Sequence, residues 1–192
     1  MEITANVPGA TAAIDGVVTT LPANFLWYPR STHTVFMMGT MPISAQSRYR
    51  FTRWEDGNTS LARQIVMPNA TLRVLATYQT EHLVSVSAMP AAGGTIHGDG
   101  WYGEGTRAQL EARPASGYVF TRFTGDVTSS QAALTLTVTG PLNVAAQFSP
   151  GFTVGGTALK NGSGSGEAVG LLSPLGQADW RMSAAAGEGE DR

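Results

Sequence analysis

Apolar and polar residues alternate along most of the chain with a period of two. Between residues 82 and 90, Val84, Val86 and Ala88 alternate with serines. This is the pattern of a β-strand that has one face on a core and the other in water. The same alternation recurs further on, in residues 106–114, 132–140 and 142–148. Because turns with Gly or Pro separate these segments, we predict roughly five or six short antiparallel strands here, and no helix.

The first third of the chain shows the same pattern. Residues 2–17 read as a strand, a Pro-Gly turn, a short strand and an Asp-Gly turn of the kind that closes hairpins. We predict further strands over residues 23–29, 32–38 and 49–54, and a loop over residues 41–47.

One motif occurs twice. Phe-Thr-Arg-Trp at residues 51–54 returns as Phe-Thr-Arg-Phe at residues 120–123, about 70 residues later. Each copy is followed by an alternating strand, a proline turn and a strand that ends near an aromatic residue. We therefore predict two tandem small antiparallel β modules, residues 2–80 and 81–149.

From Pro150 onward the composition changes to glycine, serine and other small residues. Such stretches behave as flexible linkers. We predict that residues 150–192 are a partly disordered tail, flexible from about residue 160, or the truncated start of a further module.

Composition and charge narrow the function classes. Charged residues make up 14% of the chain and the net charge is −2, so no basic surface is expected to attract nucleic acid. No apolar run is long enough to span a bilayer, so we expect no membrane insertion by this segment. The chain has no cysteine, which excludes disulfides and thiolate metal sites.

The N-terminus, MEITANVPGA, lacks the basic and apolar regions of a signal peptide. Read literally, this is a cytoplasmic start. Alternatively, Met1 is an internal residue of a longer secreted polypeptide. We favour the second interpretation, because the chain opens directly into a strand-like segment.

Several segments of the second copy carry a resemblance to a known family. They are Ala-Met-Pro-Ala-Ala-Gly-Gly, Gly-Thr-x-x-x-Leu-x-Ala-x-Pro, Gly-Tyr-x-Phe and a terminal Val-x-Ala-x-Phe, within residues 83–149. In this series the second copy resembles the divergent InlB B-repeat, or bacterial repeat, domain. Phe123 stands where that family usually has Trp, which Trp54 keeps in the first copy. Arg53 and Arg122 depart from the small residue common before that aromatic.

The resemblance implies an all-β (or β-rich α+β) fold, β-grasp-like or sandwich-like, in repeated modules of secreted or cell-surface bacterial proteins. It implies no catalytic or metal residues. The first copy also has a weaker similarity to PEGA-type modules, in residues 7–25.

The repeated motif supplies candidate core residues. Aromatic side chains bury large areas, and a β module of this size needs such anchors. We therefore assign structural core roles to seven aromatics, with a binding platform as the alternative: Tyr49, Phe51, Trp54, Tyr118, Phe120, Phe123 and Phe148. Arg53 and Arg122 could cover an aromatic ring, extend over a sheet edge or contact a ligand.

Two aromatic pairs are candidate binding residues. Trp101-Tyr102 lies between glycines, and Trp27-Tyr28 precedes a proline. Neighbouring strand residues point to opposite faces, so at most one of each pair can enter a core. An exposed ring there would suit a sugar or a protein partner, whereas packing within a turn is the alternative reading.

Catalytic and metal chemistry find little support. His33, His82 and His97 lack zinc-site spacing, and Asp56–Ser60 lacks the continuation of a calcium loop. There is no nucleophile elbow or phosphate loop. We expect no enzyme activity, no metal and no cofactor.

The sequence thus predicts a non-catalytic repeat segment of a bacterial secreted or cell-surface protein. It would act as a spacer, stalk or adhesive presentation element, in contact with a cell-surface glycan or protein. The alternatives are a carbohydrate- or protein-binding module that uses the two aromatic pairs, and an accessory region of a larger secreted hydrolase.

Overall fold

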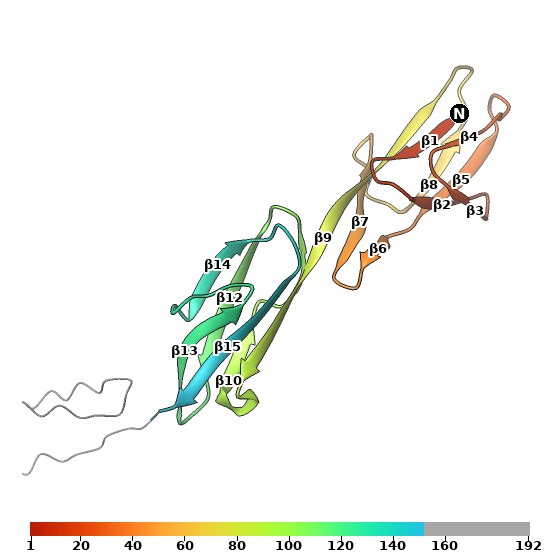
Figure 1. The fold of residues 1–192 in the computed structure, drawn as a ribbon. Coiled ribbons are helices and arrows are strands. Elements are labelled where there is room, and N and C mark those ends of the chain that lie inside the picture. The colour runs from red at the N-terminus through yellow and green to blue at the C-terminus, as the bar shows by residue number, and fades with distance from the viewer. Residues whose placement is uncertain (152–192) are drawn as a thin grey trace, which may run out of the picture. The chain divides into compact units, whose positions relative to one another are not determined.

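The computed structural model describes residues 1–151, and this part of the chain is all-β (Figure 1). The predicted all-β class is confirmed. Within residues 1–151 the one helical element is a single 3-10 turn, η1 (Ala91–Gly93). The predicted tail, residues 150–192, lies outside the described residues from position 152 onward.

Residues 1–151 form fifteen strands, most of them short. They are β1 (Glu2–Ala5), β2 (Thr11–Ile14), β3 (Val17–Thr20), β4 (Ala23–Asn24), β5 (Thr32–Met37), β6 (Thr40–Ser44), β7 (Ser47–Trp54), β8 (Ala62–Val66), β9 (Arg73–Met89), β10 (Gly94–His97), β11 (Gly100–Gly103), β12 (Arg107–Pro114), β13 (Tyr118–Gly125), β14 (Ala133–Thr137) and β15 (Leu142–Pro150).

The strands form three sheets. The largest contains β13-β15-β9-β1-β4, with β11 and β7 also paired to β9, and β6 paired to β7. A second sheet has the order β3-β2-β5-β8, and a third has the order β10-β12-β14. Each smaller sheet faces one part of the largest sheet across a core, so the architecture is sandwich-like.

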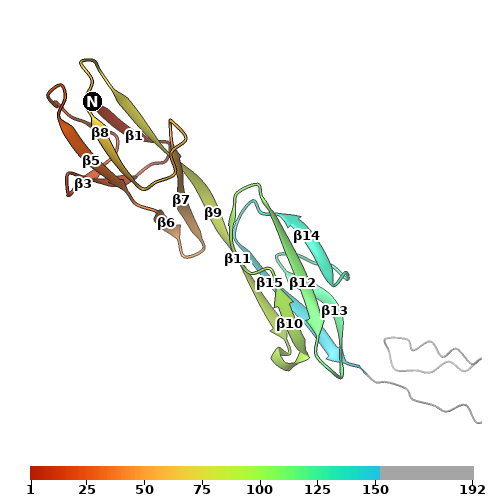
Figure 2. The same ribbon diagram turned by 180° about the vertical axis from the view of Figure 1, so that it is seen from behind.

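Strand β9 is 17 residues long and carries the largest sheet through both cores (Figures 1 and 2). The register shows which strands share an edge of β9. Ala76 pairs with β1 and β7, Glu81 with β7 and β11, and Val84 with β11 and β15. A strand residue has one partner on each side, so β1 and β11 follow one edge and β7 and β15 the other.

Even-numbered residues of β9 face the cores. Val74, Ala76 and Tyr78 belong to the first core, and Val84 belongs to the second. The alternation keeps its phase over the whole strand, as the period of two requires.

The two cores are surrounded by strands in the same order of connection. In the first, β1 runs parallel to the first part of β9, and β7 is antiparallel to it. In the second, the last part of β9 runs parallel to β15, and β13 is antiparallel to β15. Strand β9 is thus the last strand around the first core and the first strand around the second.

The repeated Phe-Thr-Arg motif forms the same irregularity in both places. The pairing register shifts between Phe51 and Arg53 in β7, and between Phe120 and Arg122 in β13. Such a shift is a β-bulge, which bends a strand locally. The threonine inside each bulge donates its hydroxyl to a carbonyl of the neighbouring strand, at 2.9 Å in both copies.

Two local expectations differ from the structure. Residues 23–29 contain only the two-residue strand β4, because the chain continues as a loop from Phe25. The segment predicted as a loop, residues 41–47, mostly belongs to β6, which forms a hairpin with β7. The division into modules of residues 2–80 and 81–149 stays a prediction, and its boundary lies within β9.

Candidate functional site

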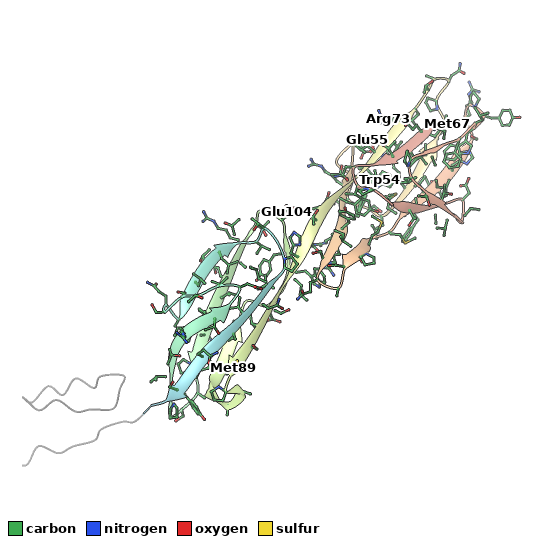
Figure 3. All side chains as sticks on the ribbon, viewed as in Figure 1. Trp54, Glu55, Met67, Arg73, Met89 and Glu104 are labelled. Carbon is green, nitrogen blue, oxygen red and sulfur yellow. The ribbon has the colours of Figure 1, made fainter. Side chains whose placement is uncertain are left out.

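The seven aromatic residues assigned to the cores are buried to different degrees. Phe51, Trp54, Phe123 and Phe148 are buried, and Trp54 is shown among the side chains of the first core in Figure 3. The other three pack against the same clusters while partly exposed: Tyr49, Tyr118 and Phe120.

The ring geometry repeats between the two cores. Phe51 meets Tyr78 edge-on at 5.6 Å between centroids, and Phe120 meets Phe148 in the same way at 6.0 Å. Edge-to-face contact is a favourable arrangement for aromatic rings. The repeated motif thus places one edge-on ring pair next to each bulge.

The arginines of the motif do not cover these rings. Arg53 and Arg122 are exposed. Within residues 1–151 the arginines that lie over aromatic rings are Arg63, 5.4 Å from Trp54, and Arg48, 4.1 Å from Trp101.

The predicted binding pair Trp101-Tyr102 lies on β11. Tyr102 turns toward the second core, where its hydroxyl donates to the Gly98 carbonyl at 3.0 Å. Trp101 pairs with Leu83 and faces the opposite side of the sheet. Both side chains are half-buried.

A charged cluster, which we call the junction cluster, surrounds Trp101. It consists of Arg48, Arg50, Glu81 and Trp101. Glu81 accepts hydrogen bonds from Arg48 Nε at 2.7 Å and from Arg50 Nη1 at 3.2 Å, and its side chain is only 6% exposed. The guanidinium of Arg48 reaches across β9 from β7 to the ring of Trp101 on β11, so one side chain bridges three strands.

On the opposite face of β9, side chains also connect neighbouring strands at this point. Ser47 and His82 are both buried, and the Ser47 hydroxyl lies 2.9 Å from His82 Nδ1. In the turn between β6 and β7, Gln46 Nε2 donates to Asn143 Oδ1 of β15 at 3.0 Å, which links the hairpin to β15. The two cores are therefore joined by side chains as well as by the shared strand.

The second predicted pair lies in the loop between β4 and β5. Trp27 stacks on Phe25 at 4.9 Å and on the His33 ring at 3.6 Å, nearly parallel to the latter. Its flat faces are therefore occupied. By contrast, the residues on either side of Trp27 are exposed: Tyr28 is 85% exposed and Leu26 is fully exposed.

His33 also connects Asp15 and Ser31. Its Nδ1 lies 2.6 Å from Asp15 Oδ2 and its Nε2 lies 2.8 Å from Ser31 Oγ. Hydrogen bonding to His33, and then to the Thr34 backbone amide, lowers the pKa of the Asp15 carboxyl. Asp15 and Gly16 both have positive φ and form the two-residue turn between β2 and β3.

The Asp15–His33–Ser31 chain has the connectivity of a nucleophilic triad, but its proton arrangement differs. A nucleophilic serine donates its proton to the imidazole. Here Ser31 Oγ donates to the Tyr28 carbonyl at 2.7 Å. The hydrogen-bonded series Asp15–His33–Ser31 therefore fixes the loop that carries Trp27 and Tyr28.

Other features of the described residues add little chemistry. Residues 1–151 contain no cluster of three acidic or histidine side chains that could hold a metal. Gly39, Thr40, Arg50, Phe51, Thr59 and Leu61 line a shallow, open depression. Within the same part of the chain no helix has the length and apolar character needed to cross a bilayer.

A comparison with protein families finds a match over the second core. Residues 84–151 match the model of the divergent InlB B-repeat domain. The match covers 68 of the 192 residues. Domains of this family are typical of bacterial surface proteins and are generally non-catalytic. No curated protein and no solved structure matches the chain.

The family match begins at Val84, inside β9, where the strand turns from the first core to the second. That residues 2–80 form a second copy of the InlB B-repeat, with a PEGA-like segment, stays a prediction.

The junction cluster was not expected from the sequence. Arg48 and Glu81 are far apart in the chain, and only the register of β7 on β9 brings them opposite one another. A usable signal was the single acidic residue in the middle of this strand, because a buried carboxylate requires a partner.

Proposed function

We propose that the chain is a non-catalytic spacer in a bacterial secreted or cell-surface protein, which holds neighbouring segments apart. The InlB B-repeat domain at residues 84–151 supports a surface setting. The observation that carries the spacer role is the continuous strand β9, around which two cores are built.

A spacer must keep its ends apart without collapsing. A Gly/Ser chain of equal length is a flexible coil whose ends fluctuate widely. Two cores that share one strand, with side-chain links on both faces of that strand, resist such fluctuation.

Surface display tests this proposal. The chain is placed between an epitope tag and a membrane anchor on a bacterial surface, and a second version replaces residues 2–150 by a Gly/Ser linker of the same length. We expect antibody-coated beads to capture cells with the folded chain several-fold better. Equal capture, at equal tag numbers per cell, would reject the spacer role.

A second candidate is an adhesive contact with a glycan or protein, proposed for the loop that carries Leu26 and Tyr28. Their exposure, on a loop fixed by the Asp15–His33–Ser31 chain, favours it. Glycan arrays and binding to host-cell surface proteins test it. We expect binding to fall with Tyr28→Ala and to persist with Trp101→Ala, whose ring already lies under Arg48. The opposite order would move the contact to β11.

A further inference from the structure

The first and last strands of the described chain both run parallel to β9. Strand β1 pairs with it from Glu2 opposite Arg73 to Ala5 opposite Ala76. Strand β15 pairs with it from Leu142 opposite Val84 to Gln147 opposite Met89. These two strands occupy opposite edges of β9, at its two ends.

This arrangement fixes how tension on the chain would be carried. Force applied at the start of β1 and at the end of β15 pulls the two strands in opposite directions along β9. In a parallel pair loaded in this way the strands slide past each other, so the evenly spaced ladder bonds resist together. Force directed across a strand pair would instead open the bonds one after another.

The contacts of β1 reinforce the pairing where it is shortest. Asn6 follows the last residue of β1, and its side-chain amide acts as an additional ladder position. Its Nδ2 donates to the Tyr78 carbonyl at 2.9 Å, and its Oδ1 accepts from the Tyr78 amide at 2.7 Å. At the other end, Glu2 pairs with Arg73 at 3.1 Å, and Arg73 is labelled in Figure 3.

We propose that residues 2–150 bear tension, with β1–β9 and β9–β15 as two shear clamps in series. The load passes from β1 across β9 to β15. Neither core is unfolded by pulling on the chain ends until its own clamp breaks. The inference rests on the proposed spacer function, because a spacer between two attachment points is where tension arises.

The clamps differ in length, which gives the order of failure. Four residue pairs join β1 to β9, and six join β15 to β9. We therefore expect the first core to open before the second. Rupture of β1–β9 would free the chain between Asn6 and Leu72, about 240 Å when extended, and rupture of β9–β15 would free Pro90 to Pro141, about 190 Å.

Single-molecule pulling on the full chain tests the proposal. The chain has no cysteine, so introduced cysteines define the attachment points. The shear geometry uses an N-terminal handle and Ser149→Cys. In two control geometries the force acts across the strand pair, at one end of it. The N-terminal handle with Ala70→Cys loads the first clamp in this way. Ala91→Cys with Ser149→Cys loads the second. All three introduced cysteines replace exposed residues.

At one pulling speed, we expect the shear geometry to break at a force at least about twofold above either control, because its ladder bonds share the load. Two steps are expected, with the longer release first. Equal forces in the three geometries would overturn the proposal.

Asn6→Ala separates the two clamps. It should lower the force of the first step and leave the second unchanged, whereas Asn69→Ala, at an exposed loop position, should change neither. An equal loss in both steps, or no loss in a variant shown by circular dichroism to be folded, would contradict the assignment of β1 as a clamp. Low rupture forces together with successful bead capture would reject load-bearing and leave the spacer function standing.

Discussion

Single side chains at two places determine how the strands of this protein are held together. At the β2–β3 turn, Asp15 uses one carboxylate oxygen for His33 and the other for the Thr34 amide. At the junction cluster, Glu81 uses both oxygens for arginines of β7. In each case an acidic residue on one segment fixes a loop or strand that is distant in sequence.

Asp15→Asn tests the first of these contacts. The pKa of Asp15 is lowered in the folded protein, so the charged form contributes stability above the pKa of the unfolded chain, about 3.9. That contribution is lost as the pH falls through the folded pKa. Asparagine keeps the turn, because Asn-Gly is also favoured there. We expect the melting temperature of the variant to lie below that of the wild type at pH 7 and to converge with it toward pH 2.

Thermal melts between pH 7 and pH 2 measure this convergence, with Asp99→Asn in an exposed turn as the matched control. If the difference between wild type and Asp15→Asn stays constant over the whole range, the contact with His33 does not depend on the carboxylate charge.

Glu81→Gln tests the junction cluster. The amide keeps the size of the side chain but removes the buried charge that holds two partly exposed arginines. Because Arg48 and Arg50 can still reach solvent, we expect a moderate loss of about 2 kcal/mol in unfolding free energy. Urea denaturation measures it, and Glu104→Gln at an exposed position should lie within about 0.5 kcal/mol of the wild type.

At the scale of single elements, the two bulged strands show what the repeated motif encodes. The Phe supplies a ring that lies edge-on to the next strand, and the Thr occupies the bulge and bonds across it. The last aromatic, Trp54 or Phe123, is then completely buried. The motif therefore specifies both a packing anchor and a bend.

Replacing the bulge threonines tests this view. Thr52→Val and Thr121→Val keep the shape of the side chain and remove one hydroxyl donor each. Thr52 is partly buried and Thr121 is exposed. We expect a loss of about 1 kcal/mol for Thr52→Val and less for Thr121→Val, since water can replace the second bond. Urea unfolding measures both, with Thr135→Val on the exposed face of β14 as control. No loss at either position would show that the bulge does not depend on this bond.

The sequence predicted where the strands lie better than which strands pair with one another. Alternation at Val84, Val86 and Ala88 correctly predicted a strand with one wet face, because side-chain period is a local property. It did not show that this strand continues upstream through Tyr78, since a single pattern cannot distinguish one long strand from two short ones. The loop around Trp27 was missed for a similar reason: stacking on His33 replaces strand pairing there.

For the candidate site residues too, local geometry was predictable and strand pairing was not. That Trp101 and Tyr102 face opposite sides could be deduced from strand geometry alone. That Arg48 covers Trp101 could not, because it depends on the register of β7 against β9.

For residues 1–151 as a whole, we expect the stability of each core to depend on the other, because both cores share β9. The second core keeps all its own strands in a fragment that starts at Glu81. That fragment lacks the side-chain contacts from the β6–β7 hairpin: Gln46 with Asn143, Ser47 with His82, Arg48 with Trp101, and both Arg48 and Arg50 with Glu81. The family match, which starts at Val84, includes none of these hairpin residues.

We expect fragment 81–192 to fold but to open more easily than the same region of the full chain. Hydrogen exchange of the β12 amides, which line the second core, reports the opening free energy in both. It should be lower by about 2 kcal/mol in the fragment, since each lost contact is worth about 1 kcal/mol or less. Trp101→Ala supplies the control for coupling: it should reduce protection in the full chain more than in the fragment, where Arg48 is absent. Identical protection in fragment and full chain would mean that the two cores are independent, and that β9 connects them without coupling their stabilities.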